Sequence, residues 1–209
     1  MSHPDQSQPS AACRALFDEY MPRIMQCRLE DLVLETPVQE MPALSERLGV
    51  RILVKREDLQ PVFSFKLRGA YAKLLSLGAA ERRRGVICAS AGNHAQGVAL
   101  AARHLGIDAM VVMPNITPEI KIAAVRKLGA SVVIEGDDFD SACAYAMRAA
   151  QEQDRVFIHP YDDPQVITGQ ATIALELFRQ NHSPIEYLFV CVGGGGLAAG
   201  MALVSKYLH

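Results

Sequence analysis

The sequence lacks the features by which several classes of protein are recognised. No apolar run approaches membrane-spanning length, and the polar start, Met1 to Ser10, has no apolar signal core. The formal net charge is −2, and no basic cluster suited to nucleic acid is present. The five cysteines are scattered without a C-x-x-C pair, so neither a metal site nor a disulfide framework is indicated. We therefore expect a cytoplasmic protein with no membrane, nucleic-acid or metal partner.

Short β-branched runs alternate with amphipathic segments along most of the chain. This alternation is typical of an α/β fold in which helices wrap parallel sheets, and ligands then bind at the carboxyl ends of the strands. The predicted strands are 51–55, 85–89, 109–113, 131–135, 156–159 and 187–192. The predicted helices are 65–77, 93–105, 118–128, 139–153 and 164–180.

Lys66 is the most informative residue for function, because it begins a predicted helix within the string Ser64-Phe65-Lys66. The first turn of a helix disfavours positive charge, and Arg56 and Arg68 stand close in sequence. The pKa of the Lys66 amine should therefore be lowered, as Schiff-base chemistry with a carbonyl cofactor requires. The alternative is that Lys66 is an ordinary solvated lysine.

A second segment, Ser90 to Gly97, follows the predicted strand 85–89 and reads Ser-Ala-Gly-Asn-His-Ala-Gln-Gly. Small residues between a strand and a helix expose backbone N–H groups at the helix start, where an anion binds readily. The segment is therefore a candidate cradle for a carboxylate. The alternative is that Asn93 is a plain helix N-cap and His94 a surface residue.

A third segment, Gly193 to Gly196, follows the predicted strand 187–192. A tight turn needs one or two glycines, so a phosphate that contacts backbone amides at a helix start explains four of them better. The run also fits a weak G-x-G-x-x-A pattern at Gly194, Gly196 and Ala199, which leaves a nicotinamide-dependent oxidoreductase open as an alternative.

Three strings in this order resemble the threonine dehydratase (threonine ammonia-lyase) family, and the first is closer to its biosynthetic branch. They run from Lys55 to Tyr71, from Ser90 to Gly97 and from Val192 to Leu197. The resemblance implies a pyridoxal-phosphate enzyme of the two-domain tryptophan-synthase-β-like fold, also called fold type II. It further implies a large domain formed by residues 1–85 and 158–209, with a smaller α/β domain, 86–157, inserted between them.

Carried over motif by motif, the resemblance also implies roles for individual residues. Lys66 would be the catalytic residue and would hold pyridoxal 5'-phosphate covalently, with Phe65 packing beside the ring. Asn93 would hydrogen-bond the pyridine hydroxyl, and Gly193, Gly194, Gly195, Gly196 and Leu197 would hold the phosphate. Ser90, Ala91, Gly92, Asn93 and His94 would receive the substrate carboxylate. Lys66 would then remove the Cα proton of L-threonine, which leads to 2-oxobutanoate and ammonia.

Members of this family continue past the position of His209 with further strands and helices, including a serine or threonine that faces the pyridine nitrogen. We therefore expect a C-terminally truncated chain with an incomplete large domain, an unpaired sheet edge at 187–192, and a homo-oligomer in the full-length form. Two further alternatives stay open. One is a catalytically silent fragment that binds cofactor or partner chains, and the other is a serine dehydratase or serine racemase of the same family.

Overall fold

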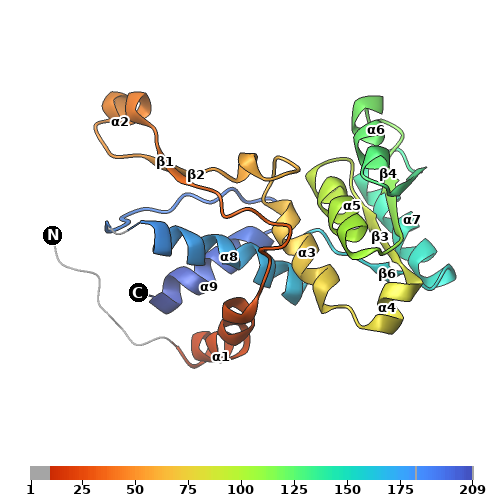
Figure 1. The fold of residues 1–209 in the computed structure, drawn as a ribbon, viewed down its shortest axis with the longest axis horizontal. Helices are drawn as coiled ribbons and strands as arrows, with labels where there is room; N and C mark the ends of the chain where they lie inside the picture. Colours follow the sequence, from red (N-terminus) through yellow and green to blue (C-terminus); the bar gives the residue numbers. More distant parts are fainter. Residues whose placement is uncertain (1–9, 182, 209) are drawn as a thin grey trace.

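Helix α3 (Lys66–Ser76) lies at the centre of the molecule and joins its two parts (Figure 1). The computed structural model describes residues 10–181 and 183–208. On one side α3 packs against α5 (Asn93–Leu105), which covers a parallel sheet. On the other side it packs against α8 (Pro164–Gln180), which belongs to a group of helices. The start of α3, where Lys66 stands, therefore lies where the two parts meet.

The parallel sheet has the strand order β5-β4-β3-β6. Its strands are β3 (Val86–Ala89), β4 (Ala109–Met113), β5 (Ser131–Ile134) and β6 (Val156–Phe157). Successive side chains of a strand point to opposite faces. Accordingly Val86 and Cys88 pack in the core beneath α5, whereas Ile87 and Ala89 pack with α7 (Phe139–Glu152). Both faces of β3 are thus buried, which explains its continuous apolar sequence.

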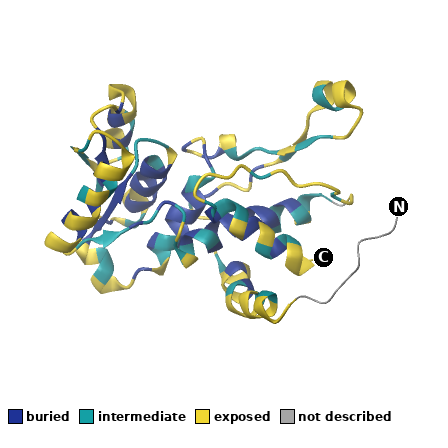
Figure 2. Cartoon of the chain, turned by 180° about the vertical axis from the view of Figure 1, so that it is seen from behind, coloured by how far each residue is buried: buried dark blue, intermediate teal, exposed yellow. Residues whose placement is uncertain are grey.

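The second part consists mainly of helices α1 (Ala11–Gln26), α8 and α9 (Gly196–Leu208), which share one apolar core. Close approach of α9 to α8 depends on Gly200, because a Cβ there would lie 2.8 Å from the carbonyl oxygen of Ile167. A hairpin of β1 (Val38–Glu40) and β2 (Leu53–Lys55), which carries α2 (Pro42–Leu48), extends from this part (Figure 1). The hairpin is mostly exposed, whereas α3, α5 and α8 carry much of the buried surface (Figure 2).

The remaining elements are short. They are the 3-10 helix η1 (Glu57–Leu59), α4 (Ala79–Arg84) and α6 (Glu119–Lys127). Within the described part of the chain, no helix is long and apolar enough to cross a membrane, and no group of three or more His, Cys, Asp or Glu side chains could hold a metal ion.

The predicted α/β fold is confirmed, and the predicted helices occur with ends that agree to within one residue. The prediction of a strand at 187–192 is wrong. A strand requires a hydrogen-bonded neighbour, and no described segment pairs with these residues, so Tyr187 and Phe189 are 80% and 94% exposed. All four strands of the parallel sheet lie within 86–157, and the domain boundaries themselves stay a prediction.

Candidate active site

The candidate site is built around the first turn of α3. Phe65 is the N-cap residue, and the backbone N–H of Lys66 donates to Ser64 Oγ at 3.3 Å. Phe63, which precedes Ser64, has a φ of +57°, a left-handed conformation that is uncommon for a bulky side chain. A tight, strained connection therefore leads into the turn that carries Lys66.

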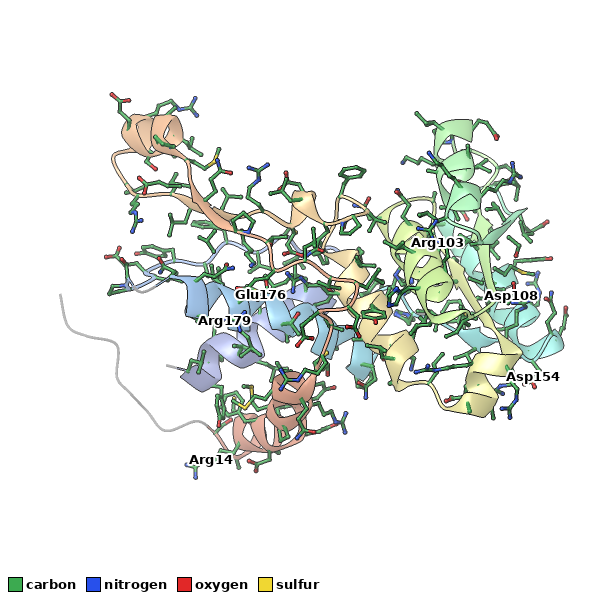
Figure 3. The ribbon with its side chains drawn as sticks, viewed as in Figure 1. Arg14, Arg103, Asp108, Asp154, Glu176 and Arg179 are labelled. Atoms are coloured by element: carbon green, nitrogen blue, oxygen red, sulfur yellow. The ribbon has the colours of Figure 1, made fainter. Side chains whose placement is uncertain are left out.

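A buried group of charged side chains holds this helix start in place. Arg68, only 1% exposed, donates from Nη2 to Glu57 at 2.7 Å and from Nη1 to Glu176 at 2.6 Å. Glu176, which projects from α8 near the middle of the molecule, also accepts from Lys55 Nζ at 2.6 Å (Figure 3). These bonds tie α3 to β2, η1 and α8. Because Arg68 lies two residues after Lys66, they also limit how far the Lys66 backbone can shift.

The amine of Lys66 is partly buried and makes one short hydrogen bond, from Nζ to the carbonyl oxygen of Pro160 at 2.7 Å. It also lies 5.6 Å from the centre of the Phe65 ring. Burial lowers the pKa of the Lys66 amine, while the charge of Cys191 acts in the opposite direction. The sequence prediction of a lowered pKa is therefore confirmed, and the alternative of a solvated lysine is wrong.

The cause of that lowered pKa differs from the one we expected. We attributed it to the helix terminus and to two arginines, but the arginines are compensated by carboxylates. Arg56 pairs with Asp58 at 2.7 Å, and Arg68 pairs with Glu57 and Glu176. Loss of water around the Lys66 amine is the main cause.

Lys66 shares a pocket with the glycine run, as the sequence predicted for two parts of one site. The residues lining the pocket come from α3, from the loop after β6, from α8 and from the start of α9. They are Phe65, Lys66, Pro160, Tyr161, Gln170, Cys191, Gly193, Gly194, Gly195, Gly196 and Leu197. Segments distant in sequence therefore converge on one amine.

The structure gives a separate reason for three of the four glycines. A Cβ at Gly194 would overlap the ring of Tyr161, and a Cβ at Gly196 would overlap the carbonyl oxygen of Tyr161. Gly195 has a φ of +90°, which side chains rarely adopt. An added Cβ would have open space at both Gly193 and Gly195, but only Gly193 combines that space with a φ that side chains adopt. The run ends at the first turn of α9, a 13-residue helix whose free N–H groups favour an anion.

The loop after β6 forms a wall of the pocket that the sequence analysis missed. His159 Nδ1 accepts from the backbone N–H groups of Tyr161 and Asp162, at 3.3 and 2.8 Å. The rings of His159 and Tyr161 also meet edge to face, 4.7 Å apart. These contacts fix Tyr161 against the glycine run. A general rule, that ligands bind beyond the carboxyl ends of parallel strands, could have directed attention to this loop.

The Ser90 to His94 segment follows β3 and leads into α5. Ser90 Oγ accepts from the N–H of Gly92 at 3.1 Å, and Gly92, rather than Asn93, is the N-cap residue of α5. Asn93 is the first helical residue and is exposed. The interpretation of Asn93 as a plain N-cap is therefore wrong. Its predicted contact with the cofactor hydroxyl is a separate matter and stays a prediction.

His94 is buried, so the interpretation of this residue as a surface histidine is also wrong. Its Nε2 lies 3.1 Å from the carbonyl oxygen of Ile158, and Nδ1 has no partner among the described residues. Burial, with a smaller contribution from the charge of Lys66, lowers the pKa of His94 to about 4. The ring is therefore neutral at pH 7.

Residues 90–94 do not line the pocket of Lys66, but they lie near it. Helix α5 crosses α3 closely at Gly97, where a Cβ would lie 3.2 Å from the carbonyl group of Lys66. The charge of Lys66 also lowers the pKa values of both His94 and His159. The structure thus brings Lys66 and the glycine run into one pocket, with the Ser90 to His94 segment beside it.

Comparison with known proteins identifies the family. Residues 29–208 match the family described as pyridoxal-phosphate dependent enzyme. The chain belongs to this family. The family match leaves the nicotinamide-dependent oxidoreductase alternative without support.

The similar proteins include biosynthetic threonine dehydratases. The chain is 54% identical over 188 residues to threonine dehydratase 1 biosynthetic, chloroplastic, of Solanum lycopersicum, covering 90% of this chain and 31% of that protein. It is 49% identical over 190 residues to the L-threonine dehydratase biosynthetic IlvA of Escherichia coli, covering 91% and 37%. The chain therefore spans about a third of the length of these curated relatives.

Solved structures of this pyridoxal-phosphate dependent enzyme family have the same fold. The processed form of threonine deaminase isoform 2 from Solanum lycopersicum superposes with a TM-score of 0.89 at 47% identity, covering 93% of this chain and 56% of that one. Maize serine racemase superposes with a TM-score of 0.85 at 33% identity, covering 90% and 57%. The resemblance inferred from the three strings is thereby confirmed.

The residues present fit the cofactor that gives the family its name. A buried amine with a lowered pKa suits a carbonyl carbon, and helix-terminal amides beside glycines suit a phosphate. The pocket therefore offers a covalent anchor and an anion site to one ligand.

Proposed function

We propose that this chain carries the cofactor site of a pyridoxal-phosphate-dependent threonine ammonia-lyase, which converts L-threonine into 2-oxobutanoate and ammonia in isoleucine biosynthesis. The observation that carries the proposal is that the Lys66 amine, its pKa lowered by burial, lies in one pocket with the glycine run at the start of α9. The identity of about half to biosynthetic threonine dehydratases supports the choice of substrate.

In this proposal each part of the site has one task. Lys66 anchors the cofactor and later takes the proton from the substrate Cα, while the cofactor supplies an electron-withdrawing ring that makes this proton acidic. The amides of Gly193, Gly194, Gly195, Gly196 and Leu197 bind the phosphate. Asn93 hydrogen-bonds the cofactor hydroxyl, and Ser90 to His94 receive the substrate carboxylate. Loss of the β-hydroxyl then completes the β-elimination.

L-serine is the second candidate substrate, since the chain is also 33% identical to maize serine racemase. A chain that binds the cofactor without turnover is the other alternative, since the match covers only about a third of the curated relatives. We also propose the division into 1–85, 86–157 and 158–209. The cytoplasmic location and the homo-oligomer stay predictions from the sequence.

The decisive experiment is to incubate the chain with pyridoxal phosphate, reduce with borohydride and map the labelled peptide. We expect the label on Lys66 and none in Lys66→Ala. Lys55 and Lys73 are internal controls, because each amine forms an ion pair at 2.6 Å, with Glu176 and Asp163. A label on either control would contradict the assignment. Release of 2-oxobutanoate from L-threonine would then distinguish a lyase from a chain that binds the cofactor without turnover. Release of pyruvate from L-serine would show whether serine is also a substrate.

A further inference from the structure

The glycine run has few bonds that could hold its shape. The backbone N–H groups of Gly193, Gly194 and Gly195 donate no hydrogen bond to the other described residues. Glycine has more conformational freedom than any other residue, so successive glycines sample many backbone conformations unless something confines them. An anion bound at the start of α9 requires these amides to point in one direction. The conformation of the run therefore depends on its packing against other parts of the chain.

Tyr161 supplies this packing. A Cβ added to Gly194 would overlap the ring of Tyr161, and a Cβ added to Gly196 would overlap the carbonyl oxygen of Tyr161. The side chain of Tyr161 therefore lies against one glycine, and its backbone lies against another. Gly193 and Gly194 nevertheless remain exposed. The ring thus supports the run from one side and leaves its amides open to a ligand in the pocket that they share with Lys66.

The loop that carries Tyr161 is itself well fixed. His159 Nδ1 accepts from the N–H of Tyr161 at 3.3 Å, and the two rings meet edge to face, 4.7 Å apart. The His159 ring also meets the ring of Phe157 in β6 edge to face, 6.3 Å apart. Between His159 and Tyr161 stands Pro160, whose carbonyl oxygen accepts from Lys66 Nζ. One short loop therefore contacts both the amine and the glycine run.

We propose that Tyr161 is a positioning residue for the phosphate site, and that its ring holds the glycine run in the conformation in which the amides bind the phosphate. The inference rests on the proposed function and deepens it. Because the ring orders the run before a ligand binds, less conformational entropy is lost on binding. Ordering the backbone of even one residue costs about a factor of ten in affinity.

The test replaces Tyr161 with Ala, which removes the ring and retains the backbone that contacts Gly196. Affinity is measured by absorbance titration with two probes, pyridoxal phosphate and pyridoxal, which lacks the phosphate. We expect Tyr161→Ala to weaken binding of pyridoxal phosphate about tenfold and binding of pyridoxal much less, since only the phosphate uses the glycine run. Tyr161→Phe, which keeps the ring, should retain the affinity that Tyr161→Ala loses.

Gly194→Ala provides an independent variant. Gly194 has no positive φ, and the three atoms nearest to its added Cβ would all belong to the ring of Tyr161. In the unmodified chain the substitution should displace the run and weaken binding of pyridoxal phosphate. In the Tyr161→Ala background it should have little further effect, because the ring that the Cβ would strike is gone. Additive losses from the two substitutions would overturn the proposal.

Tyr145→Ala is the matched control. Tyr145 lies in α7, is half-buried like Tyr161, and packs against the buried residues between α7 and the parallel sheet. Loss of its ring should lower the melting temperature and leave the affinity for both probes unchanged. Equal losses of the two probes in Tyr161→Ala would overturn the proposal, because a phosphate site affects only one of them. If Tyr161→Ala does not fold, Tyr161→Leu, which removes the ring and keeps apolar bulk, takes its place in the same titrations.

These outcomes are distinguishable from failure of the proposed function. If the unmodified chain takes no label on Lys66, the proposed function fails, and the role of Tyr161 fails with it. If Lys66 is labelled but Tyr161→Ala binds pyridoxal phosphate as tightly as the unmodified chain does, only the role of Tyr161 fails.

Discussion

The Nζ of Lys66 donates a hydrogen bond to the carbonyl oxygen of Pro160 at 2.7 Å. The acceptor is neutral, so the bond positions the amine without adding a negative charge that would hold its proton strongly. A lysine paired with a carboxylate would behave differently, and Lys55 and Lys73 are paired in that way. This contrast favours Lys66 over Lys55 and Lys73 as the proposed point of attachment for the cofactor.

The first prediction concerns the pH dependence of Lys66 labelling. An amine reacts with a carbonyl compound only when it is unprotonated, and burial lowers the pKa of Lys66. The rate of labelling should therefore reach half its maximum at a lower pH than that of the exposed Lys127, which serves as the reference in the same digest. Mass spectrometry of both peptides across a pH series gives the comparison. Coincident profiles would contradict the prediction.

The second prediction concerns the glycine run. Gly193 is the position in the run at which a side chain can be added without overlap or backbone strain, because its Cβ would meet nothing within 4 Å and its φ is not positive. Gly193→Asp should weaken pyridoxal phosphate binding by about tenfold or more, since its carboxylate repels the phosphate. Gly193→Asn is the matched neutral control and should bind more tightly than Gly193→Asp. Equal affinities of the two variants would mean that the phosphate binds elsewhere.

The sequence predicted the part of the molecule in which local pattern and burial agree. In β3 the run from Val86 to Ala89 is apolar throughout because both faces of the strand are covered. The strand predicted at 51–55 is present as β2, but its hairpin partner β1 was not predicted, because that three-residue strand is partly exposed and carries no continuous apolar pattern. The strand predicted at 187–192 has a strand-like sequence but no neighbour to pair with.

The sequence motifs of the site could be predicted, but the contacts that form the rest of its pocket could not. Lys66 and the glycine run each stand in a recognisable string, so their roles could be inferred before their positions were known. The contact of Tyr161 with Gly194 joins segments that only the folded chain brings together, and no local signal encodes it. For the same reason the close packing of Gln170 against Gly69 could not be predicted from the sequence, since it depends on how α8 lies against α3.

The third prediction concerns the buried charges that hold α3. Arg68→Met should destabilise the chain by about 3–5 kcal/mol, because it leaves the buried carboxylates of Glu57 and Glu176 without this partner. The free energy of unfolding from urea denaturation measures the effect. Arg51→Met, which removes an exposed ion pair with Glu40, is the control and should cost less than about 1 kcal/mol. Similar losses in the two variants would show that the Arg68 network contributes little.

The fourth prediction concerns acid stability. The pKa of His94 is about 4 in the folded chain and about 6.5 in an unfolded one, so the unfolded chain binds the extra proton between these values. The contribution of His94 to stability is therefore complete above pH 6.5 and is lost as the pH falls toward 4, by roughly 3 kcal/mol in total. His94→Asn should flatten this part of the profile measured by urea denaturation. The control is His104→Asn, which removes an exposed histidine from the same helix.

The last prediction concerns the strained residue that leads into α3. Phe63 has a φ of +57° and is 76% exposed, so its side chain gains little from packing while its backbone is held in a conformation that favours glycine. Phe63→Gly should therefore stabilise the chain by about 0.5–1 kcal/mol, since the relief of strain exceeds the added entropy of the unfolded glycine. Ile116→Gly is the matched control, because Ile116 has the same exposure and is not among the described residues with positive φ. That variant should lose stability, because it gains only the unfolded-state entropy. If both variants are destabilised equally in urea, the conformation of Phe63 costs the folded chain no measurable stability.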